Sequence, residues 1–209
     1  MVRDQQIILS ICTVHHGDER YVRQLVRSIE QYTHSISYEI IVVDNMADRP
    51  ALSFPMGSKV TVIKNTEMRG YAANLNAALR KARGEYCAIL NNDILILPPE
   101  EEKIRGVLTQ VKSGVDEIVF PPTDSICGFT KLIQDFKANP DIDCMGPMIL
   151  LPDGTIQVEC ARGIPTIVDQ LWELLHLDVS FPSVKLFNHY KMLYWDRSDS
   201  RQVECLLGA

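Results

Sequence analysis

Short apolar runs that end in polar residues recur along the first half of the chain. Such runs, when turn signals bound them, are typical of strands buried on both faces of a parallel sheet. Four runs are predicted as strands: residues 7–14, 38–44, 60–63 and 86–93. Helical spacing of apolar residues predicts a helix over residues 18–33, and a second that begins at Arg69-Gly70 and is ended by Gly84. This order predicts an α/β fold with a mostly parallel sheet and right-handed crossovers.

The second half of the chain has a less regular pattern. Residues 94–99 and 118–122 are two apolar runs that end in a Pro pair, and each precedes a helical pattern. They predict two strand–Pro–Pro–helix units in a row. Further along, the pattern predicts a strand over residues 143–151, a hairpin turn at residues 152–154, and a helix that begins at Pro165.

Composition supports one folded domain and argues against some partners. The 209 residues are 46% hydrophobic and 23% charged, which suffices for one sizeable core. No linker composition divides the chain, so a single domain over residues 1–209 is predicted, with a last strand at residues 203–207. The net charge of −6 disfavours nucleic acid and anionic membrane surfaces as partners.

The cysteines and the amino terminus bear on the cellular location. Six scattered cysteines without a CxxC pair are interpreted as mostly small buried hydrophobes rather than a disulfide framework. No signal-peptide pattern and no apolar run of about 20 residues is present, so no transmembrane segment is expected. These features favour a cytoplasmic protein, and they leave peripheral attachment to a membrane open.

Three of the predicted strands end in polar residues, which marks a candidate site. The residues at these ends are Thr13 and His15, Asp44 and Asn45, and Asn92 and Asp93. In a parallel sheet the three ends share one edge, where open α/β sheets bind ligands. Carboxylates there can bind a base or ribose, or hold Mg²⁺ or Mn²⁺, which prefer oxygen ligands. The alternative is that the carboxylates are strand-end caps or turn residues. We favour a functional site because two of them end adjacent strands, and we interpret Asp93 as the metal-binding carboxylate.

Two further features have both a functional and a simpler interpretation. Arg69-Gly70 opens a helix, where backbone N–H groups favour anions and an Arg adds a forked donor for phosphate. A solvated surface Arg is the simpler alternative. His15 and His16 are adjacent, so they cannot share a helical face, and exposure in a loop is favoured over metal ligation.

Taken in chain order, these segments resemble family 2 glycosyltransferases of the GT-A fold, and most closely the bacterial rhamnosyltransferase-like members. The segments that carry the resemblance are residues 7–13, 38–45, 65, 69–73, 82–86, 90–93, 139–140, 146–147, 152–154 and 203–209. The resemblance spans nearly the whole chain. It implies a Rossmann-like, mostly parallel open sheet with helices on both faces.

The resemblance implies an activity and a set of site residues. The activity is inverting transfer of a sugar from a nucleotide-diphosphate sugar (dTDP-, UDP- or GDP-linked) to a saccharide or lipid-linked acceptor, with Mg²⁺ or Mn²⁺. By position, Thr13 and Asp44 would line the nucleoside pocket, Arg69 and Gly70 would lie near the ribose and diphosphate, and Asp93 would bind the metal. The full set of predicted donor-site residues is Thr13, His15, Asp44, Asn45, Arg69, Gly70, Asn92 and Asp93.

The chain departs from the family pattern at three places. Val14 replaces the family's tyrosine, and residues 94–117 form a candidate insertion after the predicted metal strand. The family's acceptor-side half, with its acidic general base, would follow Ala209, so the chain is expected to lack it. A non-catalytic nucleotide-sugar-binding or interaction module is therefore the alternative function. A nucleotidyltransferase is disfavoured, because no glycine-rich phosphate loop with a basic follower lies near the first strand.

Overall fold

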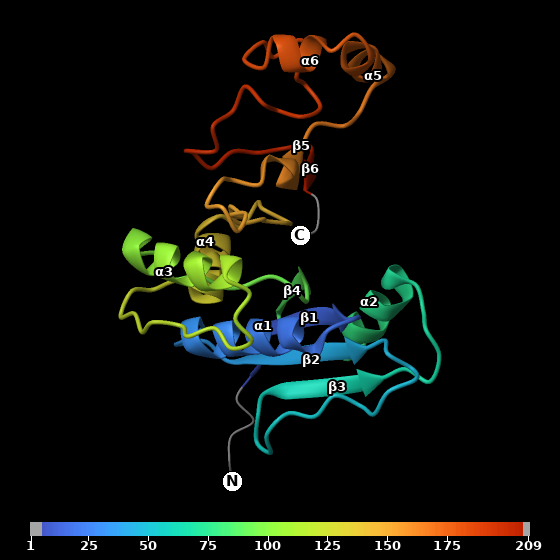
Figure 1. The fold of residues 1–209 in the computed structure, drawn as a ribbon, viewed down its shortest axis with the longest axis vertical. Coiled ribbons are helices and arrows are strands. Elements are labelled where there is room, and N and C mark those ends of the chain that lie inside the picture. Colours follow the sequence, from blue (N-terminus) through green and yellow to red (C-terminus); the bar gives the residue numbers. More distant parts are fainter. Residues whose placement is uncertain (1–5, 207–209) are drawn as a thin grey trace. The chain divides into compact units, whose positions relative to one another are not determined.

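The computed structural model describes residues 6–206 and divides into two compact units, Met1–Asn139 and Pro140–Ala209 (Figure 1). Each unit is described by itself. The single domain expected over residues 1–209 stays a prediction.

The first unit is built on a four-stranded parallel sheet. Its strands are β1 (Leu9–His15), β2 (Tyr38–Asp44), β3 (Val60–Lys64) and β4 (Tyr86–Asn91). Their order is β3-β2-β1-β4, and every neighbouring pair is parallel (Figure 1). Leu9 at the start of β1 pairs with both Tyr38 and Tyr86. All four predicted strands are confirmed, with ends that shift by one or two residues.

Burial differs between the central and the outer strands. Every residue of β1 and β2 is buried, as expected for strands covered on both faces. The same expectation is wrong for β4, where half-buried and exposed positions alternate over the first four residues and Ile89 is 43% exposed. The reason is that Tyr86, Ala88 and Leu90 pack against the buried cluster on one face of the sheet, whereas no β4 residue joins the cluster on the other face.

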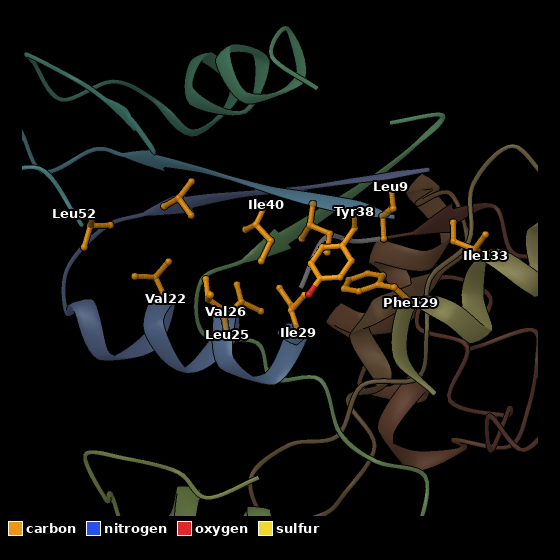
Figure 2. Close-up of a cluster of buried hydrophobic side chains, with 12 residues drawn as sticks. Leu9, Val22, Leu25, Val26, Ile29, Tyr38, Ile40, Leu52, Phe129 and Ile133 are labelled. Atoms are coloured by element: carbon orange, nitrogen blue, oxygen red, sulfur yellow. The ribbon is translucent and has the colours of Figure 1, made fainter. Parts of the chain in front are cut away.

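Helix α1 (Glu19–Tyr32) covers one face of the sheet. Its N-cap is Asp18, whose side chain accepts a hydrogen bond from the backbone N–H of Arg20. The apolar side of α1 packs on side chains of β1 and β2, and Phe129 and Ile133 complete the cluster (Figure 2). The cluster includes Leu9, Ile11, Val22, Leu25, Val26, Ile29, Ile40 and Val42.

Helix α2 (Tyr71–Leu79) lies on the opposite face. Ala78 of this helix joins a second buried cluster with Cys12 and Val14 of β1 and with Ile41 and Val43 of β2. Alternate residues of each strand therefore feed the two clusters, as the pleat requires. The prediction of an α/β fold with a mostly parallel open sheet and helices on both faces is confirmed.

The segment after β4 packs along α1. Helices α3 (Glu101–Lys112) and α4 (Gly128–Ala138) confirm the two predicted helices. The predicted strands before them, residues 94–99 and 118–122, do not form. Their backbone groups bond to side chains of α1 instead. Ile96 N donates to Ser28 Oγ (3.0 Å), and Tyr32 Oη donates to Pro121 O (2.8 Å).

The candidate insertion 94–117 is also tied to α1 by charge. Arg20 pairs with Asp116 at 2.8 Å, and Arg27 pairs with Glu117 at 2.6 Å. These pairs are exposed, so solvent screening leaves each a small contribution to stability. Burial of Val107 of α3 anchors the segment further.

The second unit has little regular structure. It contains a two-residue antiparallel pair, β5 (Ala161–Arg162) with β6 (Cys205–Leu206), a 3₁₀ turn (Val158–Cys160), and helices α5 (Ile167–Leu174) and α6 (Leu177–Ser180). The predicted turn at residues 152–154 forms, but the predicted strand 143–151 is reduced to one bridge between Leu150 and Ile156. Helix α5 begins just after Pro165, behind a capping box of Thr166 and Asp169. Within the predicted last strand, Leu207 lies outside the described residues.

Cysteine burial differs from the expectation. All six cysteines are free, but only Cys12 and Cys127 are buried, and Cys87 and Cys144 are exposed. The interpretation as mostly buried hydrophobes is wrong because Cys87 lies on the outer strand β4 rather than in the covered centre of the sheet. None of the described helices has the length and apolar character needed to cross a membrane.

Gly84 has a different role from the predicted one. Helix α2 ends at Leu79, and Gly84 lies against β1, where Ser10 Oγ accepts hydrogen bonds from the N–H groups of Gly84 (2.8 Å) and Arg83 (3.1 Å). A Cβ at Gly84 would stand 2.5 Å from Ser10 N and 2.7 Å from the carbonyl carbon of Leu9. Gly84 therefore permits close contact between backbones.

We expect Gly84→Ala to lower the free energy of unfolding by about 3 kcal/mol, because the clash is with backbone atoms that cannot rotate away. The matched control is Gly106→Ala in α3, where an added Cβ meets nothing within 4 Å. It should raise stability by about 0.5–1 kcal/mol. Urea unfolding of both variants measures the difference, and equal midpoints would contradict the assignment.

Candidate functional site

The carboxyl edge of the sheet brings the predicted strand-end residues together. His15 is in register with Asp44, and Val14 with Asn91. The backbone pairing continues beyond the strands, because Asn45 N donates to His15 O at 3.0 Å. The ends of β1, β2 and β4 therefore share one edge, as the sequence predicted.

Asp44 is buried and its carboxylate is fully engaged. Oδ1 accepts a hydrogen bond from Met46 N (3.1 Å), and Oδ2 accepts from Leu52 N and Lys64 Nζ (both 3.1 Å). Burial raises the pKa of this carboxyl, but the hydrogen bonds and the Lys64 charge outweigh burial and hold the pKa below its ordinary value. Asp44 thus holds the segment that follows β2 in place. This agrees with the alternative in which the carboxylate is a turn residue. A role in the nucleoside pocket stays a prediction.

Thr13 and His15 are buried polar residues with unmatched atoms. Thr13 Oγ1 and His15 Nδ1 have no hydrogen-bond partner among the described residues. Because strand residues alternate, both side chains lie on the face that α1 covers. Burial lowers the pKa of His15 despite the opposing charge of Asp44, so its imidazole is neutral at pH 7. The predicted loop exposure is wrong for His15, since β1 extends to it, and holds for His16.

Three buried asparagines connect the ends of β2 and β3 to the start of α2. Asn65 Nδ2 donates to Asn45 Oδ1 (2.9 Å) and to Asn74 Oδ1 (2.7 Å). Asn45 Nδ2 and Asn74 Nδ2 both donate to Arg69 O, at 3.0 and 3.1 Å, and Arg69 N donates to Asn45 Oδ1 at 2.9 Å. Sequence reasoning missed Asn74. The signal available was an Asn at a position that faces the sheet in an otherwise alanine-rich helix.

The start of α2 is open to a ligand. Its N-cap, Gly70, has extended backbone angles (φ −65°, ψ 155°) and offers no side chain to the first-turn N–H groups. An added Cβ at Gly70 would meet nothing within 4 Å. The side chain of Arg69 is 52% exposed and lies 3.4 Å from Glu67. Uncapped N–H groups beside an exposed guanidinium that is only weakly paired form an arrangement that suits an anion.

Asn92 and Asp93 follow β4 at the same edge. Asn92 Nδ2 donates to His16 O at 3.4 Å, a long bond. Asp93 is exposed and makes no hydrogen bond or ion pair with other described residues. No cluster of three His, Cys, Asp or Glu side chains within residues 6–206 could hold a metal alone. One free carboxylate does fit Mg²⁺ or Mn²⁺ when substrate phosphates supply further ligands.

Two surface hollows, each about 480 Å³, are lined by none of the residues of this edge. One is lined by residues of α3 and the segment after it, including Gln110 and Val119. The other is lined by residues of α5 and the segment after α6, including Trp172 and His189. The candidate site therefore rests on the convergence of polar groups rather than on a hollow.

A family model described as glycosyl transferase family 2 matches residues 10–147. A protein of Haemophilus influenzae described as an uncharacterized glycosyltransferase is 30% identical over 133 residues, which are 62% of this chain and 45% of that protein. Another, from Methanocaldococcus jannaschii, is 30% identical over 105 residues, 48% of this chain and 36% of that protein. The chain spans less than half the length of these curated relatives.

Solved glycosyltransferase structures show a limited likeness. A mannosyltransferase from Pyrobaculum calidifontis, in complex with GDP-Man and Mn²⁺, aligns with a TM-score of 0.34 and 22% identity, over 46% of this chain and 30% of that chain. TarS of S. aureus aligns with a TM-score of 0.35 and 18% identity, over 51% of this chain and 20% of that chain.

The engaged carboxylate of Asp44 predicts a pH-dependent stability. Its folded-state pKa is lowered, so its contribution is present above the unfolded value of about 3.9 and is lost as the pH falls through the folded value. We expect Asp44→Asn to cost about 2–3 kcal/mol at pH 7, with a smaller difference from wild type at pH 3. Urea unfolding at both pH values measures this. Asp93→Asn is the exposed control and should change stability by less than about 0.5 kcal/mol. If the free energies of unfolding of Asp44→Asn and wild type differ by the same amount at pH 7 and pH 3, the assignment is contradicted.

Proposed function

The chain belongs to glycosyl transferase family 2, and we propose that it binds a nucleotide-diphosphate sugar at the carboxyl edge of its parallel sheet as the donor in glycosyl transfer. The match covers the four strands, α1 and α2. The GT-A fold class of the resemblance agrees with this sheet and its two helical layers. The observation that carries the proposal is the uncapped start of α2 beside the exposed guanidinium of Arg69, at the edge where polar strand ends gather.

We assign the diphosphate to Arg69 and the first turn of α2. Backbone N–H groups at a helix start attract negative charge, and the guanidinium adds a bidentate donor. During transfer, negative charge builds on the departing nucleoside diphosphate. Donors fixed in advance at that position stabilise the charge without reorganisation. Gly70 contributes by having no side chain that could compete for these N–H groups.

We assign the nucleoside to the neighbouring ends of β1 and β2. Thr13 Oγ1 and the neutral imidazole of His15 are buried polar groups without partners among the described residues, and they support this placement beside Asp44 and Asn45. A nucleobase or ribose would supply the missing hydrogen bonds. Both side chains are buried, so binding there requires local movement of the segments packed over them.

We assign a divalent cation, Mg²⁺ or Mn²⁺, to Asp93, with Asn92 beside it. The free carboxylate and the absence of a larger ligand cluster within residues 6–206 fit a cation held jointly by the protein and the donor phosphates. A bound cation would neutralise charge on the diphosphate. The chain's own part is to place one carboxylate at the end of β4.

We further propose inverting transfer to a saccharide or lipid-linked acceptor, with a dTDP-linked donor included because of the rhamnosyltransferase-like resemblance. We assign the acidic general base to none of residues 1–209. The curated relatives are more than twice as long as their matched segments.

Donor binding is tested by thermal unfolding with UDP, GDP and dTDP, each with and without Mn²⁺. At a concentration 100 times Kd, a ligand stabilises by about 2.7 kcal/mol, which is about 5–10 °C for a chain of this size. We expect one nucleotide to give such a shift with Mn²⁺, and Asp93→Ala to abolish the metal-dependent part. Asp124→Ala, another exposed carboxylate, should keep the full shift. No shift with any nucleotide would overturn the proposal. Sugar-transfer assays with the binding nucleotide's sugars then separate an enzyme from a binding module.

Gly70→Asp should separate stability from binding. An Asp at the N-cap accepts hydrogen bonds from the first turn of α2 and places a negative charge there, so it should raise stability by about 1 kcal/mol. The same carboxylate competes with the diphosphate, so nucleotide affinity should fall at least tenfold. Gly70→Ala is the matched control and should bind as wild type, since its Cβ has open space and its φ suits any residue. Isothermal titration measures both, and wild-type affinity in Gly70→Asp would contradict the diphosphate assignment.

A further inference from the structure

We propose that Asn45, Asn65 and Asn74, here called the asparagine clamp, form a positioning device for Arg69 that sets the affinity of the site for the diphosphate. The inference rests on the proposed function and adds residues whose effect on the ligand is indirect. The three side chains come from the end of β2, the end of β3 and the inner side of α2, and their exposed fractions are only 6%, 7% and 1%.

The hydrogen bonds of the clamp fix the orientation of all three amide groups. Asn65 Nδ2 donates to the Oδ1 atoms of both Asn45 and Asn74, so these two oxygens face inward. Their Nδ2 groups are thereby turned toward Arg69 O, which accepts from both. A flip of any one amide would set donor against donor or acceptor against acceptor. The network therefore has a single favourable arrangement.

The clamp holds both backbone polar groups of one residue. Arg69 N donates to Asn45 Oδ1, and Arg69 O accepts from Asn45 and Asn74. Fixing the N–H and the C=O of a residue restricts its φ and ψ and so the direction of its Cα–Cβ bond. The clamp therefore sets the direction in which the Arg69 side chain leaves the backbone. The side chain itself is 52% exposed and pairs only weakly with Glu67 within the described residues.

A contribution to stability does not by itself explain why three buried asparagines surround Arg69. Buried amides must be fully hydrogen-bonded to offset their desolvation, and apolar side chains of similar volume would pack a helix on a sheet at least as well. Asn45 and Asn74 instead bond to Arg69, a loop residue whose side chain is 52% exposed, and Asn65 holds both of them in place. That residue directly precedes Gly70, the uncapped start of α2. A preorganised anion site explains the convergence, because rigid donors bind without an ordering cost.

A double-mutant cycle on ligand affinity tests the proposal. The variants are Asn74→Ala, Arg69→Ala and the double variant, and the measurement is Kd by titration with UDP, GDP or dTDP in Mn²⁺, using the nucleotide that gives the largest thermal shift to wild type. We expect each single change to raise Kd about tenfold, and the double variant to raise it by about tenfold as well, not a hundredfold, because Asn74 acts through Arg69. Independent effects that multiply, or an unchanged Kd in Asn74→Ala, would overturn the clamp.

A second variant and a control guard against simple unfolding. Asn74→Leu keeps a similar volume and adds no charge but loses the donor to Arg69 O, so it should also raise Kd about tenfold in a folded protein. Asn188→Ala removes an equally buried asparagine (1% exposed) of the second unit, whose Nδ2 donates to the carbonyls of Asp178 and Phe181. It should lose stability and keep the wild-type Kd. If wild type binds no nucleotide, the proposed function fails. If it binds and the effects multiply, only the clamp is overturned.

Discussion

The parallel pairing of β1 with β2 and β4 is the constraint on which the candidate site depends. Its register sets His15 beside Asp44 and ends three strands at one edge. Burial of β1 and β2 on both faces holds that register, because a slip of one residue would turn apolar side chains of both clusters toward the wrong face. Polar residues can then lie at the strand ends without weakening the core between them.

The polar residues at this edge fall into two groups. Asp44 and the asparagine clamp have their hydrogen bonds satisfied within the protein, and they fix the segments that follow β2 and precede α2. Thr13 Oγ1, His15 Nδ1 and the carboxylate of Asp93 lack partners among the described residues, and the start of α2 lacks a side-chain cap. The satisfied group forms the framework, and the unsatisfied group is the part that a ligand would complete.

Charge adds a further constraint. A chain with a net charge of −6 repels a nucleoside diphosphate at long range, so binding must rely on local donors. The guanidinium of Arg69, the open N–H groups of α2 and a cation on Asp93 would provide three such sources at one edge. The affinity for a diphosphate depends more on how these donors are oriented than on how many there are. The residues that orient Arg69 therefore matter as much as Arg69 itself.

Periodicity was enough to predict the four strands and helices α1 to α4, because these depend on neighbours close in sequence. The shared edge of Thr13, Asp44 and Asn92 followed from the parallel topology that this order of elements implies. The sequence could not reveal that β4 is an outer strand, that Gly84 meets the backbone of β1, that Asp44 is already satisfied, or that Asn74 holds Arg69. Each of these is decided by a partner from a distant segment. Local pattern determines which elements form and which residues end them. Only tertiary packing decides which polar groups are occupied and which remain available to a ligand, because a hydrogen bond is a property of two groups brought together.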